Sequence, residues 1–503
     1  CLLFVPRDRY DADVRQRAGQ ILAERWGGRV SAWYPQLSDA PLVRVHYIIG
    51  VTPGQHLNPD PAAVEAEIAE ATRGWSERIE KAARDAGAAF GSASAVATRW
   101  ADGFPNDYRD RYSAAEALVD VAEIERLGSE GVRVRAFREA EDSNLSFRFK
   151  LYRAGTQPVP LADVLPLLED MGLKAMEEYG YAVCDGERTV WIHEYLLEDP
   201  RGADLSFAEV KDPFEQAFVA VWTGLTESDG FNRLVLELGV GWREAALLRA
   251  LARYRQQSGL DPSQAVQEEA LRDNPAVARA LIALFLLKFD PARGGDAAAR
   301  EAEVKAAHQA VLDGLQAVAS LDHDRVLRRL LLLIGAVKRT NYFQASREGG
   351  PKRYMSFKIA SRELADLPAP KPFREIWVWS PRVEGVHCRF GPVARGGLRW
   401  SDRRDDFRTE VLGLVKAQQV KNAVIVPVGS KGGFYPKQLP RTTDREAIQG
   451  EAIRAYRTFL SGLLDITDNI AADGSVTHPA NVIAWEGDDP YLVVAADKGT
   501  ATF

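Results

Sequence analysis

Cysteine is nearly missing from this chain of 503 residues, which contains only Cys1, Cys184 and Cys388. Three scattered thiols are too few for a disulfide framework or a cysteine-based zinc site. The seven histidines are also scattered singly, so the sequence predicts no metal centre. Such sparse cysteine usage is typical of a reducing compartment, and we expect the protein to be cytoplasmic.

Long apolar runs and an excess of positive charge are missing as well. The longest apolar runs, 280–287 and 330–337, are far shorter than the roughly 20 residues that span a membrane. No secretory signal is visible. The net charge is −7, which gives no chain-wide attraction for nucleic acid or anionic membranes. We expect neither as a partner, and any anion site must come from a local cluster.

The length and composition are those of a globular protein with about three domains of roughly 150 residues each. The chain begins with Cys1 instead of Met, and its last residues follow an apolar run at 491–496. Neither end has the polar composition typical of a natural terminus. We expect a fragment of a longer polypeptide, and proteolytic processing is the alternative.

The first 205 residues contain two similar patterns of strands and helices. The first runs strand 1–5, helix 11–24, strands 30–34 and 42–51, then helix 61–86. The second has strands at 132–138 and 145–152, a helix at 161–179 and a hairpin around Asp185-Gly186. Both orders predict ferredoxin-like sandwiches. In topology they resemble ACT modules, which implies an amino-acid effector; a structural spacer is the alternative.

The middle of the chain, 214–338, is helical almost throughout. Gly239-Val240-Gly241 follows an apolar run there, but Glu244 stands where a dinucleotide motif needs its third glycine. A turn between helices is therefore predicted. Prolines at 368, 370 and 372 precede strands at 375–380 and 386–390. We predict four regions: 1–125, 126–205, a helical domain at 206–345, and a truncated α/β catalytic domain at 346–503.

The segment 391–434 is the densest in chemistry-bearing residues. Arg395-Gly396-Gly397 allows backbone and a cation to approach a ligand closely. A helix over 409–422 places Glu410, Gln418 and Lys421 on roughly one face. A buried strand at 424–428 is expected to end at Gly429, followed by the loop 430–433. Strand ends beside glycine are where α/β domains place ligand groups.

Four cations of this segment are expected to converge on a dianionic substrate: Arg395, Arg399, Lys421 and Lys431. A lysine buried among like charges loses its proton more easily and can act as a base. Lys431, held between glycines, is the best candidate. Two neighbouring features are expected to be structural and not catalytic. The mixed charges at 402–408 predict a solvated turn, and His387 is expected to have a core or supporting role. A phosphate loop is disfavoured, because Val424 replaces its first glycine.

At these residues the sequence resembles the glutamate dehydrogenases, most closely the very large bacterial NAD-specific class. Residues 395–399 are similar to the family's K-G-G-x-R segment, 418–422 to its Q-x-x-K-N pattern, and 429–433 to its G-G-x-K-G-G loop. Residues 495–499 are similar to its P-A-x-D-x-G segment. The likeness to this class is strong from about residue 371 to residue 503. The upstream region is similar to it only in the layout of its parts.

The resemblance implies roles for these residues. Lys431 would be the catalytic lysine and Asp497 a proton shuttle. Arg395, in place of the family's lysine, would bind the side-chain carboxylate of the substrate beside Gly396 and Gly397. The α-carboxylate would be bound by the helix side chains Gln418 and Lys421.

The activity implied is oxidative deamination of L-glutamate to 2-oxoglutarate and ammonia, with NAD as cofactor, in a homo-oligomer. The nucleotide-binding domain is expected after Asp497, beyond this chain. Two alternatives stay open: a dehydrogenase for another amino acid, which an apolar pocket in place of Arg395 would favour, and a non-catalytic regulatory or assembly module. The intact set of Arg395, Lys421, Lys431 and Asp497 argues against a dead remnant.

Overall fold

The computed structural model describes the chain except residues 11, 37–39, 55–56, 88–91, 129–130, 141, 203–205, 262, 295, 422–427, 498–499 and 502. The side chains of residues 8, 13 and 418–421 also lie outside the description. The chain divides into two compact units. The first comprises Cys1–Val134, Lys150–Val159 and Glu178–Glu194, and the second comprises Arg135–Phe149, Pro160–Glu177 and Tyr195–Phe503.

The first unit begins with an antiparallel sheet in the order β1-β3-β2, backed by two helices. In β3, buried Val43, Val45 and Tyr47 alternate with exposed residues, so one face of the sheet packs on the helices. The expected β-α-β-β-α order is confirmed. The elements are β1 Leu2–Pro6, α1 Ala12–Arg25, β2 Gly28–Gln36, β3 Leu42–Val51 and α2 Pro61–Ala71.

The helix expected over 61–86 is two helices: α2 ends at Ala71, and extended Gly74 precedes the start of α3 at Trp75. A cluster of aromatic side chains, among them Trp75, Trp100 and Tyr108, forms the core around the following helices. Buried Lys150 donates a hydrogen bond to Asp120 (2.7 Å), which also accepts from Tyr108 of this cluster. The helices are α3 Trp75–Asp85, α4 Ala93–Trp100, α5 Asn106–Arg111 and α6 Ala114–Glu125.

The second sandwich has a four-stranded sheet in the order β4-β5-β7-β6. The helix predicted over 161–179 is wrong beyond Asp170: α7 ends there, Gly172 has a φ of +82°, and the following residues form β6. The predicted hairpin at Asp185-Gly186 is present between β6 and β7. The elements are β4 Val132–Phe137, β5 Ser146–Ala154, α7 Leu161–Asp170, β6 Lys174–Cys184 and β7 Thr189–Glu198.

The predicted helical region is present in the second unit. Gly239 takes the left-handed conformation at the end of α9 and Gly241 precedes α10, so this pair forms a turn between helices. Within the described residues, none of the helices has the length and apolar composition to cross a membrane. The helices are α8 Phe207–Trp222, α9 Leu234–Leu238, α10 Trp242–Gln257, α11 Gln264–Asp273, α12 Pro275–Phe289, α13 Ala297–Leu315 and α14 Leu321–Ala336.

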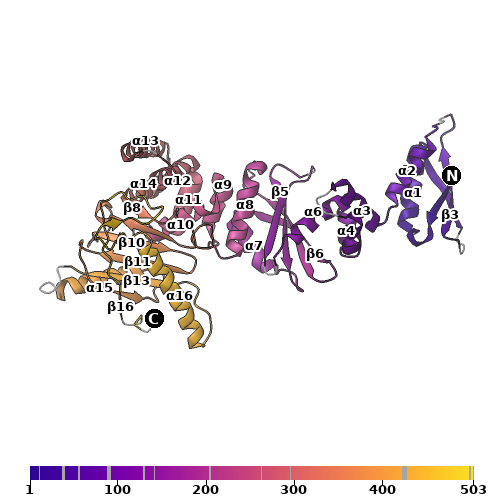
Figure 1. Cartoon of the computed structure of the whole chain (residues 1–503). Helices are drawn as coiled ribbons and strands as arrows, with labels where there is room; N and C mark the ends of the chain where they lie inside the picture. Colours follow the sequence, from indigo (N-terminus) through magenta and orange to yellow (C-terminus); the bar gives the residue numbers. More distant parts are fainter. Residues whose placement is uncertain are drawn as a thin grey trace. The chain divides into compact units, whose positions relative to one another are not determined.

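The last part of the chain is built on a seven-stranded mixed sheet in the order β16-β12-β13-β11-β10-β9-β8. Helix α16 packs on one face, where Phe459 and Leu463 meet Val378 and Phe434 in the core (Figure 1). Trp377, on β10, stacks on Phe407 of α15. The elements are β8 Val337–Thr340, β9 Met355–Ile359, β10 Arg374–Trp379, β11 Val383–Arg389, β12 Gly397–Trp400, α15 Phe407–Lys421, β13 Ser430–Pro436, α16 Arg445–Leu464, β14 Asn469–Ile470, β15 Val476–Thr477 and β16 Ala495–Ala496.

Candidate active site

Three short parallel strands bring the predicted catalytic residues together. In the middle strand β12, Leu398 is paired with Gly432 of β13 on one side and with Ala496 of β16 on the other. Residues next to these partners therefore lie close together. Lys431 is the neighbour of Gly432, and Asp497 directly follows Ala496. The Asp497 carboxylate accepts a hydrogen bond from the Lys431 ammonium.

Two glycines make this close approach possible. A Cβ atom on Gly396 would stand 1.5 Å from the carbonyl oxygen of Ser430, so no side chain fits there. A Cβ atom on Gly397 would stand 3.0 Å from the Cβ of Asp497. The Arg-Gly-Gly segment is thus needed for the backbone of β12 to approach β13 and the Asp497 turn.

Burial and a neighbouring arginine act on Lys431 against the contact with the Asp497 carboxylate, which favours the ammonium form. The residue is 5% exposed. Burial, and next the positive charge of Arg399, lower the pKa of Lys431. Arg399 is held by Glu410 of α15, at 2.6 Å from its Nε to the carboxylate, and the second Glu410 oxygen accepts from Ser401 (2.6 Å). The lowered pKa makes the neutral amine, the form that a general base requires, easier to reach.

Thr500 holds the Asp497 turn in place. Its buried Oγ1 accepts a hydrogen bond from the Asp497 amide (2.9 Å) and lies 3.0 Å from the carbonyl oxygen of Leu398, to which it donates. The Thr500 amide donates to the Asp497 carbonyl oxygen (2.9 Å). The turn that carries the carboxylate is therefore fastened to the central strand β12.

His387 lies on β11, opposite Gly432 of β13. It is buried, and burial lowers its pKa to about 4, so the ring is neutral at physiological pH. Its Nε2 lies 3.3 Å from the carbonyl oxygen of Val493. The structure thus places His387 in the core, where its neutral ring supports the segment leading into β16.

The structure brings together Gly396, Gly397, Lys431 and Asp497 among the predicted site residues, with Arg399 beside them. Arg395 is exposed; its carbonyl oxygen accepts from the Ser430 amide (2.9 Å), which fixes the backbone at the entrance of β12. The side chains of Gln418 and Lys421, predicted to bind the α-carboxylate, lie outside the described residues, although α15 itself extends to Lys421.

Two local expectations are corrected. The predicted loop 430–433 is part of strand β13, because these residues pair with β11 on one side and β12 on the other. The strand predicted at 424–428 lies almost wholly outside the described residues. Within the mixed-charge segment 402–408, Arg408 is not solvated: it is buried and donates to Glu375 at 2.6 and 2.9 Å. This ion pair anchors the start of α15.

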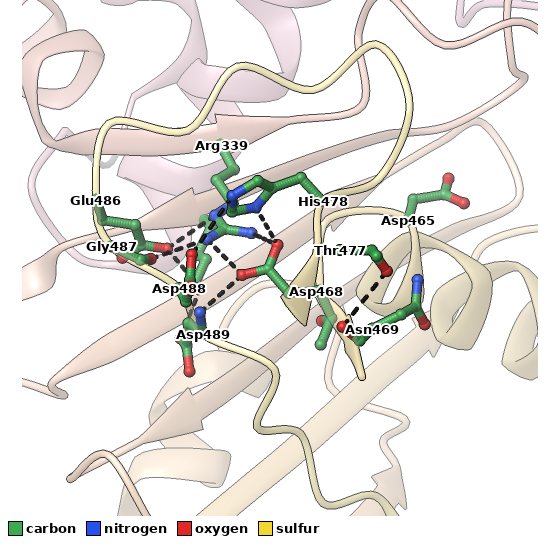
Figure 2. Close-up of polar contacts among 12 residues, drawn as sticks. Arg339, Asp465, Asp468, Asn469, Thr477, His478, Glu486, Gly487, Asp488 and Asp489 are labelled. Carbon is green, nitrogen blue, oxygen red and sulfur yellow. Dashed lines mark hydrogen bonds and ion pairs between the residues drawn. The ribbon is translucent and has the colours of Figure 1, made fainter. Parts of the chain in front are cut away.

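Sequence reasoning missed a second polar cluster, shown in Figure 2. Buried Asp468 accepts hydrogen bonds from both terminal nitrogens of Arg339, from the Asp489 amide (2.7 Å) and from His478 Nδ1 (2.7 Å). Burial alone would raise the pKa of Asp468, but these hydrogen bonds outweigh burial and hold the pKa well below its usual range. No sequence motif signals this cluster, because Arg339 and Asp468 lie 129 residues apart.

Asp468, His478 and Asp488 also place potential metal-ligand atoms within 4.8 Å of one another. The Asp468 oxygens, however, already accept from the Arg339 guanidinium, a fixed positive charge at the centre of the group. The cluster is explained by its ion pair, which fastens the loop 468–489 to β8. We assign no metal to it.

Family models match the chain along most of its length. The model described as bacterial NAD-glutamate dehydrogenase, catalytic domain, matches residues 310–503. Glutamate dehydrogenase ACT2 and ACT3 domains match 1–76 and 131–210, and helical motifs 2 and 3 match 87–127 and 226–291. The expected fold class, with ACT-like domains, helical motifs and a catalytic domain, is confirmed.

Three curated relatives, each named NAD-specific glutamate dehydrogenase, match all of the chain. The proteins from Pseudomonas aeruginosa, Halomonas elongata and Mycobacterium tuberculosis are 45%, 42% and 41% identical to it. The chain is similar to these proteins over its whole length. It spans 31%, 31% and 32% of the length of these relatives. The resemblance to bacterial NAD-specific glutamate dehydrogenases is thereby confirmed, and the match 310–503 includes the corner formed by β12, β13 and β16.

Proposed function

We propose that this chain carries the catalytic lysine and the substrate-binding part of an NAD-dependent glutamate dehydrogenase. The enzyme would oxidise L-glutamate to 2-oxoglutarate and ammonia. The observation that carries the proposal is the contact of buried Lys431 with the Asp497 carboxylate in a glycine-lined corner. The relatives' names and the catalytic-domain match point to the same activity.

Lys431 is proposed as the general base and acid. In its neutral form it would take a proton from the water that attacks the imine carbon of the oxidised substrate. Once protonated, it would stabilise the oxyanion that develops at that carbon. Burial and the charge of Arg399, which both lower the pKa of Lys431, make the neutral form accessible.

Asp497 is proposed to move protons to and from the amine nitrogen of the substrate. Its carboxylate lies against Lys431, so a proton can pass between the two groups without crossing bulk water. Thr500 would keep the carboxylate in this position through the Asp497 amide. The proton needed by the leaving ammonia would thus come from within the corner.

The carboxylates of glutamate are proposed to bind to Arg395 at the side chain and to Gln418 and Lys421 at the Cα end. Two such clamps fix the orientation of the Cα–H bond, which lowers the barrier by positioning. NAD, the proposed cofactor, would accept the hydride. The glycine pair Gly239 and Gly241 forms a turn between helices and is not a dinucleotide motif.

Several wider assignments are part of this proposal. We propose a cytoplasmic homo-oligomer with an amino-acid effector at the ACT-like domains, and no nucleic-acid or membrane partner. The three free cysteines support the reducing compartment. The division at residues 125, 205 and 345 stays a prediction. We also expect the 503-residue chain by itself to be inactive, and NAD reduction by that purified chain would contradict this.

The proposal is tested in a full-length protein carrying this segment. NAD reduction is measured with L-glutamate, L-leucine and L-phenylalanine for the unaltered protein, Lys431→Ala and the matched control Lys416→Ala. Lys416 is an exposed lysine of α15. We expect activity with glutamate that only Lys431→Ala abolishes. Preference for leucine or phenylalanine would establish the alternative dehydrogenase, and no activity with any substrate would favour the non-catalytic module.

A further inference from the structure

A separate cavity of about 1250 Å³ opens in the second unit, away from Lys431. It is lined by the turn Ser380–Arg382 between β10 and β11, by Tyr354 before β9 and by Gln438 after β13. These positions all lie where β13 ends, whereas Lys431 lies where β13 begins. The five residue steps from Lys431 to Pro436 span roughly 17 Å at about 3.3 Å per step. The cavity is therefore not part of the catalytic corner.

The walls of the cavity are well-defined structural elements. One wall is a tight hairpin, in which Ala345 pairs with Pro351 and the Ser346 amide donates to the Gly350 carbonyl oxygen (2.9 Å). Helix α16 also lines the cavity, with the hydroxyl-bearing residues Thr458 and Ser461. A cavity of this size exceeds the 300–1,000 Å³ of typical small-molecule sites, so it has room for a metabolite.

The lining of the cavity is positively charged, although the chain as a whole is acidic. Basic residues at 347, 352, 353 and 382 outnumber acidic residues at 348 and 465. Lys352 is neutralised by Asp465 (2.6 Å). Arg382 is neutralised by Glu451 (2.8 Å).

Two arginines supply the remaining positive charge. Arg347 and Arg353 are exposed on the hairpin side, and within the described part of the chain neither has an ion-pair partner. Glu348, next to Arg347 in the chain, offsets one of these two charges, so the lining keeps a net positive charge and a local positive potential. Such a potential concentrates small anions.

Uncharged groups complete the cavity. Trp242 and Tyr354 supply aromatic surface, and Ser461 adds a hydroxyl group; the Thr458 hydroxyl donates to the Arg454 carbonyl oxygen (2.9 Å) and can only accept from a ligand. Burial and the nearby Asp465 carboxylate raise the pKa of Tyr354, so its hydroxyl stays protonated. Charged groups that attract an anion, donors that bind its oxygens and aromatic surface for its carbon skeleton are thus present together.

We propose that this cavity binds a small organic or phosphorylated anion with at least two negative charges, held mainly by Arg347 and Arg353. Pairing of an arginine with a carboxylate or phosphate is bidentate and strong. Both kinds of anion share this chemistry. The site is independent of the proposed reaction, because it shares no residue with the corner around Lys431 and Asp497.

The test is isothermal titration calorimetry on the full 503-residue chain with two probes, inorganic pyrophosphate and tricarballylate. The variant is Arg347→Ala with Arg353→Ala, both on the surface. The matched control is Arg441→Ala with Arg445→Ala, two exposed arginines outside the cavity. Circular dichroism verifies that all three proteins have the same helix content.

We expect at least one probe to bind, with at least tenfold weaker binding in the Arg347/Arg353 variant and less than twofold change in the control. Tighter binding of pyrophosphate would assign the site to phosphorylated ligands, and tighter binding of tricarballylate to polycarboxylates. Absence of binding for both probes at millimolar concentration would overturn the proposal. Equal loss of affinity in both double variants would overturn it too, since the effect would then be one of net charge. Neither result would bear on glutamate dehydrogenase activity.

Discussion

Two buried lysines of the second unit have the same physical cause for a lowered pKa, yet they are placed for different tasks. Burial, with neighbouring Lys338, lowers the pKa of Lys288 on α12 to about 7. Burial, with neighbouring Arg399, also lowers the pKa of Lys431. A lowered pKa by itself therefore does not identify a catalytic lysine.

The groups around each nitrogen make the difference. Lys288 Nζ donates to three carbonyl oxygens at 2.8 to 2.9 Å, those of Ile334, Gly335 and Val337 at the end of α14. All its donors are used to satisfy a helix end. Lys431 instead contacts a carboxylate side chain that can itself exchange protons. The comparison indicates a structural task for Lys288 and a chemical one for Lys431.

The largest effect expected is loss of turnover on removing the Lys431 amine. In a full-length protein, Lys431→Ala should lower kcat about 10²- to 10⁴-fold, the usual contribution of a general acid–base group. Circular dichroism should show an unchanged fold, because Lys431 contributes one ion pair at the edge of the core. A kcat within threefold of the unaltered protein would remove Lys431 from the mechanism.

The counterpart change, Lys288→Met, should affect stability and leave chemistry intact. Methionine keeps the apolar stem but leaves the α14 carbonyls without their donor, at a cost of about 1–3 kcal/mol. Hydrogen–deuterium exchange should become faster in the last turn of α14. The control is Lys305→Met, since Lys305 is an exposed lysine of α13. A large loss of kcat in Lys288→Met would erase the distinction between the two lysines.

A smaller effect is expected on loosening the Asp497 turn. Thr500→Val removes the hydroxyl that accepts from the Asp497 amide and donates to Leu398. A loss of about 1.4 kcal/mol corresponds to roughly tenfold lower kcat. Thr500→Ser keeps the hydroxyl and should restore kcat to within about twofold of the unaltered protein, with KM unchanged in both. Equal kcat values for the valine and serine variants would show that the hydroxyl does not position Asp497.

The smallest effect is a shift of the pH profile. Arg399→Gln removes a positive charge that disfavours the protonated form of Lys431, so the pKa of Lys431 should rise. The increase of kcat/KM with pH, which reports deprotonation of the base, should then move to higher pH. The maximal rate should change little. A shift to lower pH would contradict the proposed electrostatic effect of Arg399.

Local patterns were enough to predict much of the fold and part of the site. The hairpin at Asp185-Gly186, the turn at Gly239 and the helix α15 follow from glycine placement and periodicity, which are local properties. The glycines at 396 and 397 were predicted to admit a ligand, whereas the structure shows that they admit the neighbouring backbone of β13 and the side chain of Asp497.

Pairing between segments that lie far apart in the chain could not be predicted from local patterns. The mixed charges at 402–408 predict a solvated turn, whereas Arg408 pairs with Glu375, which lies 33 residues away in the chain. The amphipathic pattern that predicts a helix over 161–179 continues past Gly172. Beyond Gly172, however, the residues form strand β6, because they pair with β7. Contacts between distant segments, and not local propensity, fix these positions.

The central claim is that Lys431 has a lowered pKa, and it is tested most directly by competitive acetylation of the 503-residue chain. Trace acetic anhydride is applied across a pH series, and mass spectrometry follows the reactivity of Lys431 and of exposed Lys416. The account predicts that the reactivity of Lys431 reaches half its maximum at a lower pH than that of Lys416. A midpoint for Lys431 equal to or above that of Lys416 would contradict it.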